Sequence, residues 1–225
     1  MSFSSELQSG ASQLWESLEH HRFVVDMASG ELPLDTFAFY IDQNLLYLPE
    51  YARAIAAGIT VSRDDAELGW FTDAVRNIVE VEIPENQELR RLVTQLGGKQ
   101  HPHHNVMAPA TLAYTSYLIA TAQRSDPLGI LALILPCAWS YGDIARARMA
   151  DCVPHPVYSE WLRFFATDEY DDVVRQLRND LDIAAQDASD KRRREVADIF
   201  LTGIRLESAF WDMAYTTQHW PDLAA

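Results

Sequence analysis

Cys137 is the residue of this chain with the clearest capacity for chemistry. It follows Pro136 inside an apolar stretch, residues 128–141, that predicts a helix. Proline has no N–H and crowds the carbonyl four residues back, so we expect a broken or kinked helix with the Ala132 carbonyl unpaired. Cys137 and Tyr141 are four residues apart on one helix face, which predicts a pocket lined by a thiol and a phenol. Alternatively, Cys137 is an inert buried residue, as most free cysteines are.

A carboxylate interrupts the apolar stripe of the last predicted helix, residues 191–217. Glu207 stands between the apolar members of that stripe, which are Phe200, Ile204, Trp211 and Ala214. Because an ionised carboxylate is costly to bury without a partner, we expect Glu207 to have a raised pKa, which suits acid and base catalysis. The alternative is a structural ion pair with an arginine on a neighbouring helix.

A second helix, predicted from a cap at Asp35 to Gly58, carries an unusual stripe of phenols and an amide. Such a surface suits stacking on, and hydrogen bonding to, a flat polar ring. The alternative is a core helix whose tyrosines reach water at their tips. The stripe consists of Phe37, Tyr40, Asn44, Tyr47, Leu48 and Tyr51.

The elements that must position these residues are all predicted to be helical. Besides the three above, apolar periodicity and the residues that start or stop helices predict helices at residues 5–20, from 64 or 65 to 81 before Pro84, at 86–96 before Gly97, and from Pro109 onward. Asp126 caps the helix that contains Cys137, residues 157–165 form another, and two long helices end the chain. Gly30 and Pro33 predict a turn. No segment alternates as a strand would, so residues 1–225 are predicted to form one all-α domain.

Composition excludes several classes of partner. The chain has 33 acidic and 18 basic residues and a net charge of −15, which repels nucleic acid and anionic membranes. The basic run at residues 191–194 is interpreted as a solvated helix start. No apolar stretch reaches the roughly 20 residues of a membrane span, and the N-terminus lacks the pattern of a signal peptide. Cys137 and Cys152 lack disulfide or zinc spacing, which indicates a reducing, cytoplasmic location. We expect no metal at His101, His103 and His104, because Pro102 separates them and no regularly spaced Cys or carboxylate follows.

Several motifs, in order along nearly the whole chain, resemble the TenA, or thiaminase II, family. They are Tyr40-x-x-Gln43-x-x-x-Tyr47-Leu48, Tyr114-Thr115-Ser116, Leu135-Pro136-Cys137-x-Trp139-x-Tyr141, His155-Pro156-Val157-Tyr158 and Glu207-x-x-Phe210-Trp211-x-Met213-Ala214-Tyr215. The resemblance implies a haem-oxygenase-like helical bundle without haem, a homotetramer, and cofactor-free hydrolysis of thiamin-derived aminopyrimidines in thiamin metabolism.

The resemblance also implies roles for individual residues. Cys137 would be the nucleophile that adds to the pyrimidine ring, and Glu207 would protonate a ring nitrogen before water completes displacement of the leaving group. Tyr47, Tyr114 and Tyr141 would form the aromatic pocket around the substrate.

Two positions depart from the family pattern. Asn44 stands where the family commonly has an aspartate that contacts the amino group of the pyrimidine, and Asp42 cannot replace it because two residues along a helix point to another face. Phe165 stands where the family has a tyrosine. An amide still accepts from an amine and donates to a ring nitrogen, but it has no charge. We therefore keep as an alternative a catalytically weak member that binds a related pyrimidine or another flat heterocycle.

Two further functions are disfavoured. A regulator that contacts DNA directly is disfavoured by the acidic chain and the lack of a recognition helix. A di-iron oxidase needs a second set of carboxylate and histidine ligands besides Glu16 and His20, which the sequence lacks.

Overall fold

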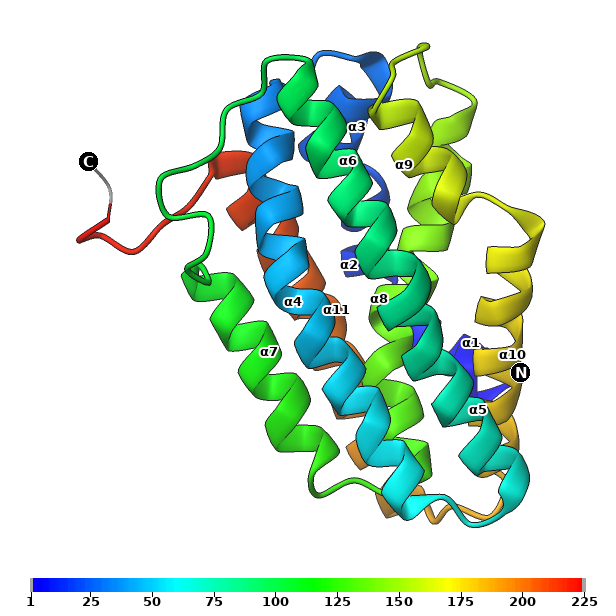
Figure 1. Ribbon diagram of the computed structural model, residues 1–225. Helices are drawn as coiled ribbons and strands as arrows, with labels where there is room; N and C mark the ends of the chain where they lie inside the picture. Colours follow the sequence, from blue (N-terminus) through cyan, green and yellow to red (C-terminus); the bar gives the residue numbers. More distant parts are fainter. Residues whose placement is uncertain (1, 224–225) are drawn as a thin grey trace.

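The computed structural model describes residues 2–223, and every regular element in that range is a helix (Figure 1). The predicted all-α class is therefore confirmed. The elements are α1 Phe3–Gly10, α2 Ser12–Glu19, α3 Arg22–Ser29, α4 Leu34–Val61, α5 Asp65–Asn77, the π-helical turn η1 Ile78–Glu82, α6 Ile83–Gln95, α7 Pro109–Ala122, α8 Pro127–Met149, α9 Tyr158–Phe165, α10 Asp168–Ala184 and α11 Asp190–Thr216.

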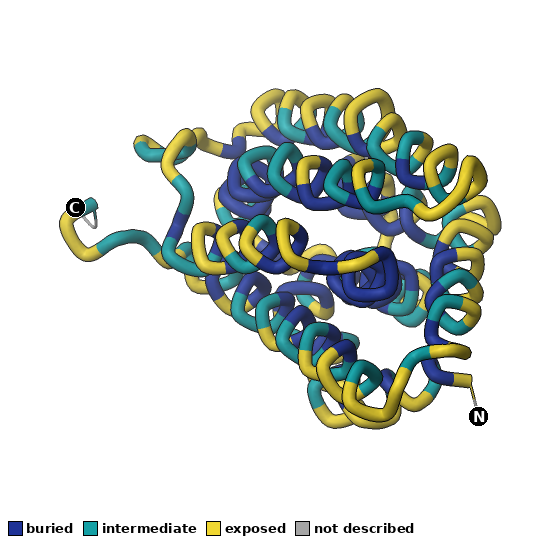
Figure 2. The backbone as a smooth tube through the Cα atoms, turned by 90° about the horizontal axis from the view of Figure 1, so that it is seen from below, coloured by how far each residue is buried: buried dark blue, intermediate teal, exposed yellow. Residues whose placement is uncertain are grey.

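Helix α8 is the centre of the bundle. It packs against α4, α9, α10 and α11, and most of its residues from Pro127 to Ala145 are buried. A helix that is apolar all round has to be covered on every side. By length and composition α8 could also cross a membrane, but 89% of its most apolar window is buried inside the bundle. Figure 2 shows the same division elsewhere, with exposed residues on the outer helix faces and buried residues turned inward.

The predicted break at Pro136 is wrong, because α8 continues through it as one helix, while the predicted kink stays a prediction. The proline ring packs against Gly203 of α11, where a Cβ atom would lie 2.6 Å from Pro136 Cγ. Glycine at this position lets the two helices approach closely. Asp126 caps α8 as predicted, its carboxylate accepting the Gly129 N–H at 2.9 Å. The unpaired Ala132 carbonyl stays a prediction.

The first part of the chain departs from the predicted pattern. Residues 5–20 form two helices, α1 and α2, that meet at Ala11, and the two-turn helix α3 was not predicted. Helix α4 begins at Leu34, and Asp35 does not cap it as predicted. The Asp35 carboxylate instead accepts the Lys99 N–H at 2.7 Å. The helix also runs past Gly58, which lies against the Phe71 ring and allows α5 to pack closely.

Pro84 does not end a helix. Helix α5 passes through the π-helical turn η1 directly into α6, and Pro84 lies in the first turn of α6. The Ile83 N–H bonds to the Ile78 carbonyl, which is the five-residue spacing of a π-turn. Such turns change the direction in which the following side chains point.

Candidate active site

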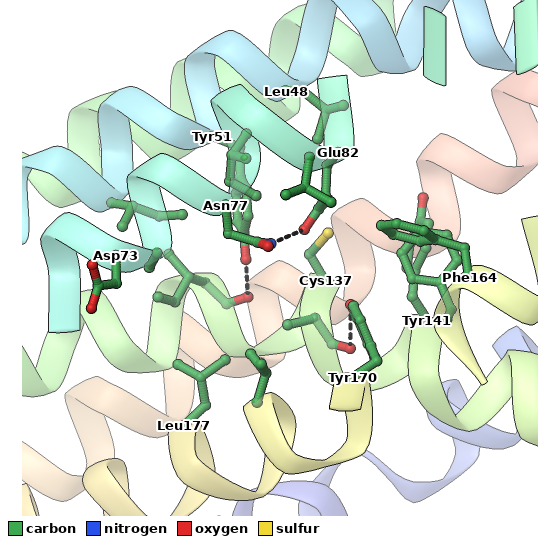
Figure 3. A pocket seen from close by; sticks show the side chains of 18 of the residues that line it. Leu48, Tyr51, Asp73, Asn77, Glu82, Cys137, Tyr141, Phe164, Tyr170 and Leu177 are labelled. Atoms are coloured by element: carbon green, nitrogen blue, oxygen red, sulfur yellow. Dashed lines mark hydrogen bonds between the residues drawn. The ribbon is translucent and has the colours of Figure 1, made fainter. Parts of the chain in front are cut away.

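A cavity of about 450 Å³ lies beside Cys137, between α4, α5, η1, α8, α9 and α10. Its size is typical of a site for a small molecule. Figure 3 shows that Cys137, Tyr141 and Tyr170 are close to one another at this site. The polar and aromatic residues that line the cavity are Asn44, Tyr51, Trp70, Asp73, Asn77, Glu82, Cys137, Tyr141, Phe164, Phe165, Thr167, Glu169 and Tyr170.

The Cys137 thiol is protonated at rest. Burial, and then the charges of Glu207 and Glu82, raise its pKa well above the usual range. This is opposite to the low-pKa cysteines that react as preformed thiolates. Cys137 therefore needs an adjacent base to become a nucleophile.

Glu207 is a buried carboxylate near this thiol. It is 1% exposed and accepts the Tyr114 hydroxyl at 2.6 Å, and its charge contributes to the raised pKa of Cys137. Burial raises the pKa of Glu207 to about 7, and the hydrogen bond from Tyr114 and the nearby Cys137 thiol lower it only in part. The raised pKa expected from the interrupted stripe is thus present. Within residues 2–223, no basic side chain forms an ion pair with Glu207.

Asn44 is held by a chain of amides. Its Nδ2 donates to Asn86 Oδ1 at 2.9 Å, and Asn86 Nδ2 donates to the Glu82 carbonyl at 2.8 Å. This chain fixes the orientation of the Asn44 amide, and Asn44 lines the cavity. Asp42 faces elsewhere, as predicted, because its Oδ1 pairs with Arg90 Nε at 2.7 Å.

The predicted pocket residues divide into two groups. Asn44, Cys137, Tyr141 and Phe165 line the cavity, and the rings of Tyr141 and Phe165 meet edge to face at 5.1 Å. Tyr47 and Tyr114 lie with Glu207 in a buried layer that adjoins Cys137, their ring centroids 4.9 Å apart. Among the described residues, the buried Tyr47 hydroxyl has no hydrogen-bond partner.

Two further tyrosines support α8 around Cys137. Tyr51 donates its hydroxyl to the Ile134 carbonyl at 2.9 Å, and Tyr170 donates to the Ala138 carbonyl at 3.0 Å. Both rings also line the cavity. Tyr51 was assigned to the aromatic stripe, whereas no local pattern pointed to Tyr170.

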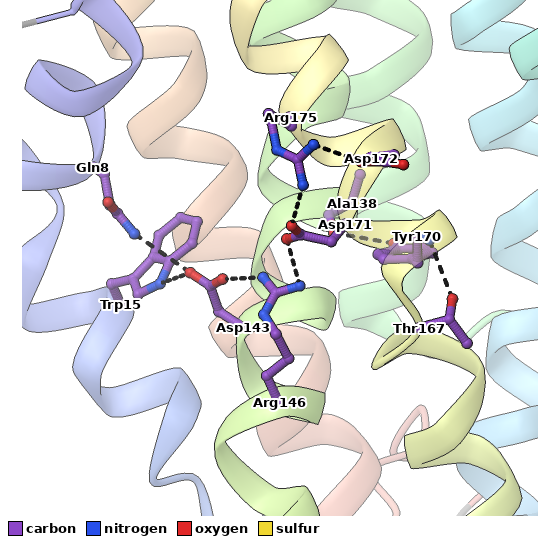
Figure 4. A network of polar contacts seen from close by, with 10 residues as sticks. All are labelled: Gln8, Trp15, Ala138, Asp143, Arg146, Thr167, Tyr170, Asp171, Asp172 and Arg175. Atoms are coloured by element: carbon purple, nitrogen blue, oxygen red, sulfur yellow. Dashed lines mark hydrogen bonds and ion pairs between the residues drawn. The ribbon is translucent and has the colours of Figure 1, made fainter.

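An ionic network secures the start of α10 on α8 (Figure 4). Arg146 bridges Asp143 and Asp171 with N–O distances of 2.7 Å to each. Asp143 also accepts the Trp15 indole N–H at 3.2 Å. This network therefore holds in place the segment that carries Tyr170.

The histidine cluster lies apart from the cavity. His101 stacks on His219 with ring centroids 3.8 Å apart and meets Phe39 edge to face. Within residues 2–223, no group of three or more His, Cys, Asp or Glu side chains is arranged to hold a metal ion.

The two residues missed most clearly were Glu82 and Asn86. Glu82 stands in an acidic segment, and its direction depends on a π-turn that periodicity does not reveal. Asn86 is 42 positions from its partner Asn44, so only the tertiary structure brings them together.

Three comparisons place the chain among known proteins. It is 35% identical to an aminopyrimidine aminohydrolase from Halalkalibacterium halodurans over 98% of both chains. Its structure superposes on the TenA homologue from P. horikoshii OT3 with a TM-score of 0.84 and 28% identity, covering 96% of this chain and 99% of the other. A haem oxygenase from Leptospira interrogans shares the fold alone, with a TM-score of 0.62 and 14% identity over 94% and 98% of the two chains.

The predicted haem-oxygenase-like fold of the TenA type is thereby confirmed. The family model described as TENA/THI-4/PQQC matches residues 9–217, nearly the whole chain. The chain belongs to the TENA/THI-4/PQQC family.

Proposed function

We propose that this protein is an enzyme that hydrolyses a thiamin-related aminopyrimidine, replacing an exocyclic amine with a hydroxyl group. The observation that carries the proposal is the aromatic cavity of about 450 Å³ that Cys137 lines, with the buried Glu207 near enough for its charge to raise the pKa of the thiol. It is supported by relatives named aminopyrimidine aminohydrolase that match over nearly their full length.

Glu207 moves a proton between the nucleophile and the ring. Its ionised form takes the thiol proton of Cys137, and the resulting thiolate forms a bond to an electron-poor ring carbon. Glu207 then gives the same proton to the adjacent ring nitrogen, so that no full negative charge builds up on the ring. A carboxyl group with a pKa of about 7 is suited to both transfers near neutral pH.

Asn44 recognises the amino group on the ring. One N–H of Asn44 Nδ2 bonds to Asn86, and its Oδ1 can accept from a donor such as an aromatic amine. Tyr141 and Phe165 provide aromatic faces for the flat ring. Tyr47 offers an unpaired hydroxyl, and Tyr114 keeps Glu207 in position.

The charge of the cavity favours a cationic substrate without phosphate. Asp73, Glu82 and Glu169 line it, and no Lys or Arg is among its described lining residues. A protonated exocyclic amine is attracted to such a surface, whereas a phosphate ester finds no cation to pair with.

A second candidate function is binding of a related pyrimidine or another flat heterocycle with weak turnover. The observation that favours it is the neutral pair of Asn44 and Asn86, which supplies no negative charge to the ring amine. From the family resemblance we also propose that the chain is a single domain, forms a homotetramer, needs no cofactor and works in the cytoplasm.

The test is ammonia release from aminomethyl-pyrimidine, compared with release of the thiazole from intact thiamin. We expect turnover by the wild type, and a loss of at least about a thousandfold in Cys137→Ser because serine does not form an anion as a thiol does. Cys152→Ala is the matched control and should keep the wild-type rate. Tight pyrimidine binding without ammonia release would favour the second candidate, and full activity of Cys137→Ser would exclude covalent catalysis.

A further inference from the structure

Glu82 brings a second carboxylate to the cavity beside Cys137. It is the last residue of the π-helical turn η1 and lines the cavity, on the opposite wall from α8. In Figure 3 its carboxylate and the Cys137 sulfur are drawn at the same site. The charge of Glu82 also contributes to the raised pKa of the Cys137 thiol, which requires that the two groups be near each other.

Glu82 has few interactions that would explain it as a structural residue. Its Oε1 accepts one hydrogen bond, from Asn77 Nδ2 at 3.2 Å, and no basic side chain within residues 2–223 forms an ion pair with it. Burial alone raises the pKa of Glu82 to about 7. A carboxyl group that has a raised pKa and no ion-pair partner, and that lies on a π-turn at the surface of a cavity, is typical of a functional position.

Cys137 thus has two carboxylates near it, and their surroundings differ. Glu207 is enclosed with Tyr114 in the buried layer, whereas Glu82 lines the cavity. In the substrate, the ring carbon that the thiolate attacks lies between a ring nitrogen and the carbon that bears the aminomethyl group. Glu207 serves the nitrogen, which leaves the proton transfers at the aminomethyl carbon without an assigned group.

We propose that Glu82 is a second catalytic residue, the base that takes a proton from the water attacking the aminomethyl carbon. The proposal rests on the proposed function. After thiolate addition, electrons from the ring break the exocyclic C–N bond, and the amine, which is protonated when bound, leaves as neutral ammonia. Water then bonds to the methylene carbon, and its proton passes to Glu82. The ring expels the thiolate, the ring N–H proton returns through Glu207 to sulfur, and Glu82 releases its proton to solvent, where the freed ammonia takes it up.

This order of events has a specific consequence. Loss of Glu82 leaves thiolate addition and C–N cleavage intact but slows the addition of water. In Glu82→Gln we expect a burst of about one ammonia per active site, followed by a steady rate reduced roughly a hundredfold. The ring should remain attached to Cys137, which intact-protein mass spectrometry detects as a covalent adduct.

Two variants sharpen the test. Glu80→Gln changes an exposed carboxylate of the same π-turn and should behave as the wild type. Glu82→Ala should regain part of its steady rate when formate is added, because the small carboxylate can enter the cavity and act as the base. A purely structural role would not respond to formate. Thermal unfolding checks that each variant is folded.

The outcomes separate this proposal from the one it rests on. A wild-type steady rate in Glu82→Gln, or a slow rate with neither burst nor adduct, overturns the role of Glu82 while leaving Cys137 as the nucleophile. If Glu82→Gln does not fold, the Glu82→Ala variant decides instead. A steady rate that formate does not restore in Glu82→Ala also overturns the role of Glu82. No turnover by the wild type, or full activity of Cys137→Ser, instead overturns the proposed function.

Discussion

Tyr114 donates its hydroxyl to Glu207 at 2.6 Å in a layer of the bundle where both side chains are almost fully buried. The hydrogen bond lowers the pKa of Glu207, yet burial raises it more strongly, to about 7. Glu207 thus keeps a proton at a pH where an exposed glutamate has lost it. The folded protein therefore holds this proton more tightly than the unfolded chain does.

This difference makes stability depend on pH. Because the pKa of Glu207 is higher in the folded state, Glu207 contributes stability that is fully present below about pH 4.5 and is lost as the pH rises through about 7. Glu207→Gln has no charge to bury. We therefore compare the free energies of unfolding of the variant and the wild type at each pH. The difference, variant minus wild type, should be more positive at pH 8 than at pH 4, by up to about 3 kcal/mol.

Urea unfolding of both proteins at the two pH values measures this effect. The comparison cancels other titrating groups, such as Glu82, that both proteins share. Glutamine keeps an oxygen that accepts the Tyr114 hydroxyl, so the packing should be preserved. An equal pH dependence in the two proteins would show that Glu207 is ionised at little cost in the folded state.

Local signals in the sequence predicted the long helices and drew attention to Asn44, Tyr141 and Glu207 as well as Cys137. Asp126 followed by Pro127 marks the start of α8, and Glu207 stands out because it interrupts an apolar stripe at regular spacing. Both depend on neighbours within a few turns of the same helix. Predictions from such patterns hold in the folded structure because the helix that carries each pattern is long and well buried.

The features that were missed depend on contacts between distant segments. The π-turn at Ile78–Glu82 joins two helices that periodicity separated at Pro84, and it is this turn that brings Glu82 to the cavity. The Asn44 amide is oriented by Asn86, which lies on another helix. Pro136 was expected to break α8, but its ring fits against Gly203 of α11.

The contact between Pro136 and Gly203 predicts a strong effect of a single methyl group. In Gly203→Ala the new Cβ would lie 2.6 Å from Pro136 Cγ, a rigid ring in a buried helix. We expect a loss of about 1–3 kcal/mol in the free energy of unfolding, despite the better helix propensity of alanine. Chemical denaturation measures the loss.

Gly69→Ala is the matched control. Gly69 also lies in a helix, α5, but a Cβ there meets nothing within 4 Å. This variant should be more stable than the wild type by up to about 1 kcal/mol. Equal gains in both variants would mean that α8 and α11 can separate at Pro136 without cost.

The last prediction concerns the acceptor that Asn44 offers to the ring amine. A carboxylate at this position forms a charged hydrogen bond, which is roughly twice as strong as a neutral one. In isolation, Asn44→Asp would therefore raise turnover of aminomethyl-pyrimidine about tenfold, equivalent to about 1.4 kcal/mol. Asn86 reduces this gain. Its Oδ1 lies 2.9 Å from Asn44 Nδ2, and in Asn44→Asp a carboxylate oxygen would take the place of that nitrogen. The two oxygens would then repel each other.

Asn86 can relieve the repulsion by turning its amide, but it then loses its bond to the Glu82 carbonyl, at a cost of about 1 kcal/mol. We therefore expect Asn44→Asp alone to raise turnover only about twofold. Adding Asn86→Ala removes the opposing oxygen, so the double variant should approach the tenfold gain. Asn86→Ala alone should lower turnover, because Asn44 loses the partner that orients it.

Steady-state kinetics of the four proteins on a small panel of pyrimidines tests this coupling. The effects of the two substitutions on turnover should not add. Asn86→Ala should lower turnover in the protein that retains Asn44 and raise it in the Asn44→Asp variant. If neither the single nor the double variant gains on aminomethyl-pyrimidine, and both lose affinity for another ring, then Asn44 pairs with a ring that needs both an acceptor and a donor. The substrate of this protein would then differ from aminomethyl-pyrimidine at the atoms that face Asn44.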